Sequence, residues 1–153
     1  MTKTVMGSLL KNVLFSDRTQ AEAQSGLPDW AVISITAGRE PAAIKKGFMD
    51  VLRIQCHDTD DEHSPYAFSA SMAADIEKFV DDVKARGATG ILVHCDGGIS
   101  RSAAVAKYIA EREDLPFNEH YSLYNRLVYS VLRNNGLVAK NAVKVPFGMY
   151  PGG

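Results

Sequence analysis

The feature that most constrains the fold is a strand, loop and helix pattern in the second half of the chain. Residues 91–94 form an apolar run typical of a buried strand, and a helical pattern begins at Arg101. Between them lie Gly97 and Gly98, which allow positive φ angles and close approach of the backbone. The N–H groups of such a loop can converge beside the partial positive charge of a helix N-terminus, so this segment predicts an anion-binding site.

Other strand and helix patterns predict what surrounds this segment. An apolar stripe with a 3.6-residue period predicts a helix over residues 68–86, which Gly87 would end. Short apolar runs separated by helical segments favour a parallel sheet with helices on its faces. We therefore expect an α/β fold with a mostly parallel central sheet flanked by helices. The expected strands cover residues 10–15, 31–36, 51–55 and 91–94, and the expected helices cover residues 19–25, 68–86, 101–113 and 118–133.

The end of the chain predicts one more helix and then a peripheral tail. Asn118 is a good N-cap, and the segment 134–136, Asn-Asn-Gly, would end the helix. Residues 137–153 hold two prolines and three glycines and are expected at the surface. No repeat or linker divides the chain, so residues 1–153 are expected to form a single domain. The buried side of the last helix would hold Leu123, Leu127, Val128, Val131 and Leu132.

Composition narrows the class of protein and its surroundings. Lys plus Arg is 17 and Asp plus Glu is 18, so a net charge of -1 argues against nucleic-acid and membrane partners. No apolar run reaches the roughly 20 residues that span a bilayer, and the N-terminus lacks a signal-peptide pattern. The two cysteines, Cys56 and Cys95, are too few for a disulfide scaffold, so we expect a cytoplasmic location. The sequence leaves the oligomeric state undetermined.

The loop before the predicted helix also carries reactive side chains. Cys95 follows the strand directly, where loop N–H groups and the helix dipole would lower the pKa of its thiol. Arg101, six residues on, can bind two phosphate oxygens through its planar guanidinium. Ser102 places a hydroxyl near the sulfur. A nucleophile, an anion-binding loop and an arginine at this spacing favour phosphoryl transfer.

These residues resemble a known family. The pattern His94-Cys95-x5-Arg101-Ser102 resembles the phosphate-binding loop of cysteine-dependent protein tyrosine phosphatases. The stretch 98–102, Gly-Ile-Ser-Arg-Ser, is most similar to the dual-specificity branch. The resemblance covers residues 30–113 and implies the α/β fold expected above.

The resemblance implies a phosphocysteine mechanism. Cys95 would attack phosphorus, Arg101 and the loop amides would hold the phosphate oxygens, and Ser102 would stabilise the leaving thiolate. His94 would support the thiolate through hydrogen bonding. The phosphate-binding residues would be Asp96, Gly97, Gly98, Ile99, Ser100 and Arg101.

The resemblance also implies a general acid, an Asp on a loop upstream of the motif. Asp58 matches best because it follows the strand expected over residues 51–55, whereas Asp60 and Asp61 remain alternatives. The separation of Asp58 from Cys95 is longer than is usual for this branch. The extra residues would lie at 62–67.

Two other chemistries fit less well. Cys56-His57 and His94-Cys95 supply a zinc-like set of ligands, but neighbours in a strand point to opposite faces, so no metal is expected. Rhodaneses and arsenate reductases have similar loops. Arg101 followed by Ser102 favours phosphate transfer over sulfur transfer, and the chain lacks the resolving cysteine pair of an arsenate reductase. No cofactor is expected.

The substrate class follows from the loop residues. The loop holds no lysine, and Asp96 would repel a highly anionic head group. A phosphorylated protein is therefore the leading partner, with phosphotyrosine first and phosphoserine or phosphothreonine left open. Two alternatives remain: a phosphatase of small, non-protein phosphomonoesters, and a catalytically weak phosphate-binding module. The intact Cys95, Arg101 and Ser102 argue against the binding module.

Overall fold

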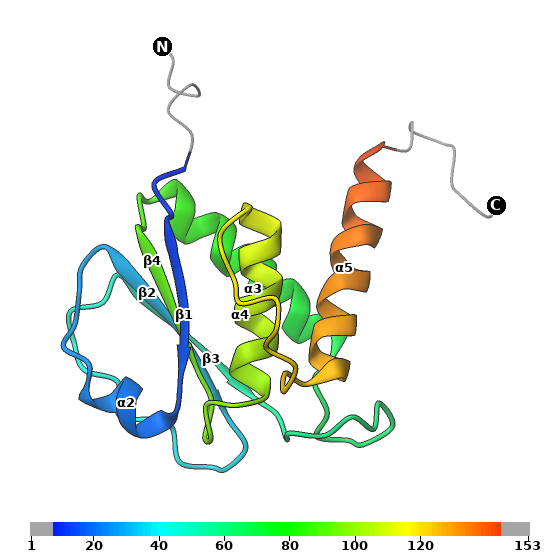
Figure 1. The fold of residues 1–153 in the computed structure, drawn as a ribbon, viewed down its shortest axis with the longest axis horizontal. Coiled ribbons are helices and arrows are strands. Elements are labelled where there is room, and N and C mark those ends of the chain that lie inside the picture. The colour runs from blue at the N-terminus through cyan, green and yellow to red at the C-terminus, as the bar shows by residue number, and fades with distance from the viewer. Residues whose placement is uncertain (1–7, 145–153) are drawn as a thin grey trace.

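The computed structural model describes residues 8–144 of the chain, and within them it has an α/β fold (Figure 1). Helices α3, α4 and α5 lie together on one side of the sheet, while α2 lies near the ends of the strands. The expected fold class is thereby confirmed. In chain order the elements are β1 (Asn12–Ser16), α2 (Arg18–Ala23), β2 (Trp30–Thr36), β3 (Asp50–Gln55), α3 (Ala70–Ala85), β4 (Gly90–His94), α4 (Arg101–Glu113) and α5 (Arg126–Lys144).

The sheet places β4 at its centre. The strand order is β1-β4-β2-β3, and each neighbouring pair is parallel. All five residues of β4 are buried, as expected for a short apolar strand covered on both faces. At its carboxyl end, His94 pairs with Ser16 of β1 and Ser34 of β2. The loop that leaves β4 therefore starts between two neighbouring strand ends, where parallel sheets commonly bind ligands.

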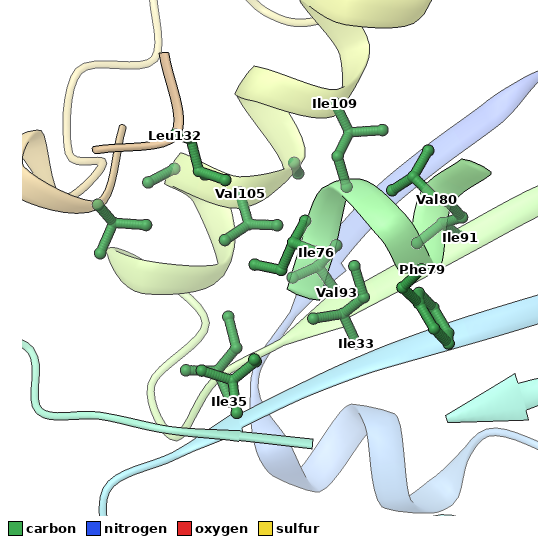
Figure 2. Close-up of a cluster of buried hydrophobic side chains, with 14 of the residues drawn as sticks. Ile33, Ile35, Ile76, Phe79, Val80, Ile91, Val93, Val105, Ile109 and Leu132 are labelled. Atoms are coloured by element: carbon green, nitrogen blue, oxygen red, sulfur yellow. The ribbon is translucent and has the colours of Figure 1, made fainter. Parts of the chain in front are cut away.

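The core packs α3 and α4 against the sheet (Figure 2). Figure 2 shows side chains of α3 and α4 meeting those of β2 and β4. Each fully buried Val or Ile side chain stabilises the fold by about 1.5–3 kcal/mol, so this core holds β4 and α4 firmly on either side of the loop that joins them. The buried core residues labelled there include Ile33, Ile76, Val80, Ile91, Val93, Val105 and Ile109.

Most predicted elements are confirmed. The ends of the four strands and of the first three helices differ from the expected ones by no more than two residues. Helix α3 ends at Ala85 with Arg86 as its C-cap, and Gly87 follows with a φ of 88°, as expected for a glycine after a helix. Among the described residues, none of the helices combines the length and the apolar content needed to cross a bilayer.

The prediction for the last helix was wrong at both ends. Residues 118–125 are irregular, α5 begins only at Arg126, and Leu123 is 63% exposed instead of buried. The side chain of Asn125, not that of Asn118, accepts the N–H of Val128 as an N-cap does (2.9 Å). The irregular segment carries contacts to the candidate site, described below, which a helix over 118–125 could not make.

Helix α5 also continues past the segment 134–136 that was expected to end it. Gly136 lies against the hydroxyl of Tyr108 on α4, and a Cβ at this position would collide with that oxygen. This glycine therefore permits close packing of α5 on α4, and the packing outweighs its low helix propensity. Residues 137–144 of the expected tail are helical, while 145–153 lie outside the described residues.

Candidate active site

The loop from Cys95 to Arg101, here called the β4–α4 loop, curls back over its first residue. Gly98 has a φ of 68°, and a Cβ there would lie 2.6 Å from the Cα of Asp17. Only glycine fits this left-handed position without moving the neighbouring backbone. The N–H of Gly98 consequently points at the Cys95 sulfur, at an N–S distance of 3.2 Å.

Cys95 is buried among hydrogen-bond donors. Its sulfur lies 3.1 Å from the hydroxyl of Ser102 and accepts the N–H of Gly98. Burial by itself would raise the pKa of the thiol. The hydroxyl and N–H of Ser102, the N–H of Gly98 and the charge of Arg101 together outweigh burial, so the pKa of Cys95 lies below its ordinary value. The site therefore favours a thiolate.

Cys56, just after β3, provides an internal comparison. It is 1% exposed, against 2% for Cys95, and both thiols are free. Burial raises the pKa of Cys56 to about 11 despite the nearby charge of Arg101. The two buried thiols thus differ in acidity because hydrogen-bond donors surround only Cys95.

Arg101 begins α4, and its guanidinium is fixed by protein groups. Nη1 donates to the carbonyl of Cys56 at 2.8 Å, and Nη2 donates to the carboxylate of Asp96 at 3.2 Å. The side chain is only 7% exposed, and its Nε has no hydrogen-bond partner within the described part of the chain. A buried N–H without a partner is costly, so Nε is a donor suited to a bound anion.

The carboxylate of Asp96 holds this arginine. It accepts the N–H of Ala37 at 3.2 Å and also lies 3.6 Å from Arg18. Partial burial would raise its pKa, but the Ala37 N–H and Arg101 lower the pKa below its ordinary value. Asp96 is therefore an anion at neutral pH and directs the guanidinium through its side chain.

His94 contacts the backbone of Cys95 and not its sulfur. The ring is fully buried, with Nε2 2.6 Å from the hydroxyl of Ser34 and Nδ1 3.4 Å from the carbonyl of Cys95. Burial lowers the pKa of His94, so the neutral ring is favoured. Its support of the thiol is thus indirect, through the start of the β4–α4 loop.

The remaining loop residues differ in their contacts. The Gly97 Cα faces open space, and Ile99 is 53% exposed, with its carbonyl accepting the hydroxyl of Tyr121 at 2.5 Å. Ser100 precedes α4 but does not cap it with its side chain. Its hydroxyl instead donates to Oδ1 of Asp58 at 2.8 Å.

Of the three candidate acids, Asp58 is the one bonded to the β4–α4 loop. Asp61 accepts the N–H of His63 within its own turn. Asp60 lines a cavity of about 330 Å³ that Asp58 and Ser100 also line. In the structure Asp58 therefore contacts Ser100, while Asp60 lies in the same cavity.

Sequence analysis missed Asn125, which contacts Asp58. The side chain of Asn125 donates to Asp58 Oδ1 at 2.8 Å and to the Thr59 carbonyl at 3.2 Å. The sequence did hold a signal for it: Asn125 stands just before the apolar pattern of α5, where an N-cap residue is expected. The prediction placed the N-cap at Asn118 instead.

The comparisons with known proteins agree with this geometry. Residues 18–140, most of the chain, match the family model of the dual specificity phosphatase catalytic domain. The chain belongs to the dual specificity phosphatase family. This phosphatase match extends beyond residues 30–113, which carried the resemblance in the sequence. No curated protein sequence matches the chain significantly.

Solved structures share the fold of this dual specificity phosphatase. Human DUSP28 is 18% identical, with a TM-score of 0.56 over 88% of this chain and 98% of that chain. A mouse protein provisionally named as a dual specificity phosphatase, complexed with zinc tungstate, is 19% identical, with a TM-score of 0.51 over 88% of each chain. At these identities the likeness concerns the fold, so residue roles in this phosphatase rest on its own geometry.

The contrast between the thiols predicts selective alkylation. At pH 7, iodoacetate should modify Cys95 and leave Cys56 unmodified, because the two are similarly buried and only Cys95 has a lowered pKa. The rate at Cys95 should rise with pH and level off below the ordinary thiol pKa, while Cys56 should react only as the pH approaches about 11. Peptide mass spectrometry distinguishes the sites, and equal labelling of both thiols at pH 7 would contradict the assignment.

Proposed function

We propose that this phosphatase hydrolyses phosphotyrosine in proteins through a phosphocysteine intermediate. The observation that carries the proposal is the pairing of an acidified thiol with a fixed arginine. Cys95 has a lowered pKa, and the buried Nε of Arg101 has no partner among the described residues. A nucleophile beside an unpaired cationic donor suits attack on a phosphate group.

In the first step the Cys95 thiolate attacks phosphorus, and an S–P bond forms as the bond to the tyrosine oxygen breaks. Arg101 and the N–H groups of the β4–α4 loop hold the equatorial phosphate oxygens. Asp58 donates its proton to the departing phenolate oxygen. The bond from Ser100 to Asp58 supports this role because it keeps the carboxyl group beside the loop.

In the second step a water molecule attacks phosphorus, and the S–P bond breaks. Asp58, now a carboxylate, takes a proton from that water, so inorganic phosphate forms and the acid is restored. The electron pair of the broken bond returns to the Cys95 sulfur. The Ser102 hydroxyl, 3.1 Å from that sulfur, stabilises the leaving thiolate.

The rim of the site favours a peptide substrate. Ile99 and Leu123 are 53% and 63% exposed, and Leu123 shares a cavity with Asp58 and Ser100. Exposed apolar side chains suit contact with an aromatic ring and its flanking residues. The carboxylate of Asp96 disfavours highly anionic ligands. Phosphoserine and phosphothreonine remain possible substrates of the same site.

Asp96 also favours a second candidate, a catalytically weak phosphate-binding module. Its carboxylate pairs with Arg101 at 3.2 Å and offsets part of the positive charge available to phosphate. Such a module would bind phosphotyrosine without turnover. A phosphatase of small phosphomonoesters would instead hydrolyse free aryl phosphates better than phosphopeptides.

The nucleophile is tested by Cys95→Ser. Hydrolysis of a phosphotyrosine peptide and of 4-nitrophenyl phosphate should be lost, since a serine hydroxyl is not ionised at neutral pH. Peptide binding and the melting temperature should stay close to those of the wild type. Cys56→Ser is the matched control and should retain activity. Turnover near wild type in Cys95→Ser would refute the covalent mechanism, and peptide binding without turnover by the wild type would favour the binding module.

The acid is tested by Asp58→Asn. Hydrolysis of a phosphotyrosine peptide should fall by about 10²–10⁴-fold, because its leaving group needs a proton. Hydrolysis of 4-nitrophenyl phosphate, whose leaving group is stable as an anion, should fall less, and inhibition by inorganic phosphate should persist.

Asp60→Asn and Asp61→Asn are the controls because both residues share the loop and its charge. Both should keep the leaving-group dependence of the wild type. If one of them shows the selective loss and Asp58→Asn does not, the acid is assigned to the wrong residue.

A further inference from the structure

Asn125 joins the two loops that carry the groups of the proposed reaction to the start of α5. Its backbone N–H donates to the Ser100 carbonyl at 3.0 Å, which ties it to the end of the β4–α4 loop. Its side-chain amide donates to Asp58 Oδ1 and to the Thr59 carbonyl, which ties it to the loop after β3 that carries Asp58. Its side-chain oxygen accepts the N–H of Val128 at the start of α5. The residue itself is only 4% exposed, whereas Asp58 is exposed, so the hydrogen bond that joins them is partly buried.

The bonds to Asp58 distinguish its two carboxyl oxygens. Oδ1 accepts from both Asn125 Nδ2 and Ser100 Oγ, each at 2.8 Å. Within residues 8–144, Oδ2 has no hydrogen bond to a protein group. A proton on Oδ1 would have to displace one of these donors, whereas a proton on Oδ2 would displace none. The neutral acid is therefore favoured in the form that carries its proton on Oδ2.

We propose that Asn125 is the positioning residue of the general acid: it fixes the Asp58 carboxyl beside the β4–α4 loop and leaves Oδ2 as the proton-bearing oxygen. This inference rests on the proposed function. An asparagine suits the position because one amide group supplies a donor for Asp58 and an acceptor for Val128. Aspartate would lack the donor.

The capping bond raises the competing explanation that Asn125 serves only the stability of α5. Asn125→Ser separates the two roles, because serine caps helices about as well as asparagine but has no amide to reach Asp58. Asn118→Ser is the matched control. Asn118 lies in the same irregular segment, and its side-chain oxygen also accepts a backbone N–H, that of His120.

The test compares two substrates in a double-mutant cycle. Asn125→Ser should lower kcat for a phosphotyrosine peptide by about ten-fold, a size common for residues in contact. The loss should be smaller than in Asp58→Asn because Ser100 still bonds to Asp58. Hydrolysis of 4-nitrophenyl phosphate should change little, and Asn118→Ser should change neither rate. In the Asp58→Asn background, Asn125→Ser should alter kcat for the peptide by no more than about two-fold.

Four results would overturn the inference. Asn125→Ser could lower kcat equally for both substrates, or could lower kcat for the peptide by the same factor in the Asp58→Asn background as in the wild type. Either result would mean that Asn125 does not act through Asp58. If Asn125→Ser has a melting temperature well below that of Asn118→Ser, Asn125→Asp replaces it in the cycle, because aspartate also caps helices. An unchanged kcat of Asn125→Asp for the peptide would then refute the role. A wild type that hydrolyses neither substrate would overturn the proposed function itself, and this inference with it.

Discussion

The candidate site depends on the hydrogen-bond donors of Gly98 and Ser102 that meet the buried sulfur of Cys95. Burial alone would keep this thiol neutral, as it does for Cys56. The Gly98 N–H reaches the sulfur only because the loop adopts a positive φ at that glycine, and Ser102 reaches it from the first turn of α4. Both donors keep their places because the core holds β4 and α4 on either side of the loop. A change in the packing of either element would therefore alter the pKa of Cys95.

The same loop is bound to its surroundings from three sides. Arg101 donates to the carbonyl of Cys56 after β3, and Asp96 accepts the N–H of Ala37 after β2. Ser100 bonds to Asp58, which Asn125 holds from the start of α5. Because parallel strands bring their carboxyl ends to one edge of the sheet, residues far apart in sequence converge here. The carboxylate of Asp96 offsets part of the charge of Arg101.

The sequence predicted the parts of this arrangement that depend on local pattern. Buried strands and the stripe of α3 follow from hydrophobic periodicity, and the β4–α4 loop follows from its glycines, Cys95 and Arg101. It failed where tertiary contact outweighs local preference. Gly136 lies inside α5 because it packs on Tyr108. Residues 118–125 stay irregular and contact the loop after β3 and the β4–α4 loop. Asn125 was therefore hidden inside a helix that does not form there.

The phosphocysteine intermediate is tested most directly by trapping it. Asp58→Asn should be mixed with 4-nitrophenyl phosphate, quenched in acid within the first turnover and digested for mass spectrometry. The first step should proceed in this variant because the leaving group of 4-nitrophenyl phosphate needs no proton. The second step should be slow because the variant lacks the carboxylate that takes a proton from water. The phosphocysteine intermediate should therefore accumulate. The account predicts one phosphate on the peptide that contains Cys95. Release of 4-nitrophenol with no covalent phosphate, or with phosphate on another residue, would contradict it.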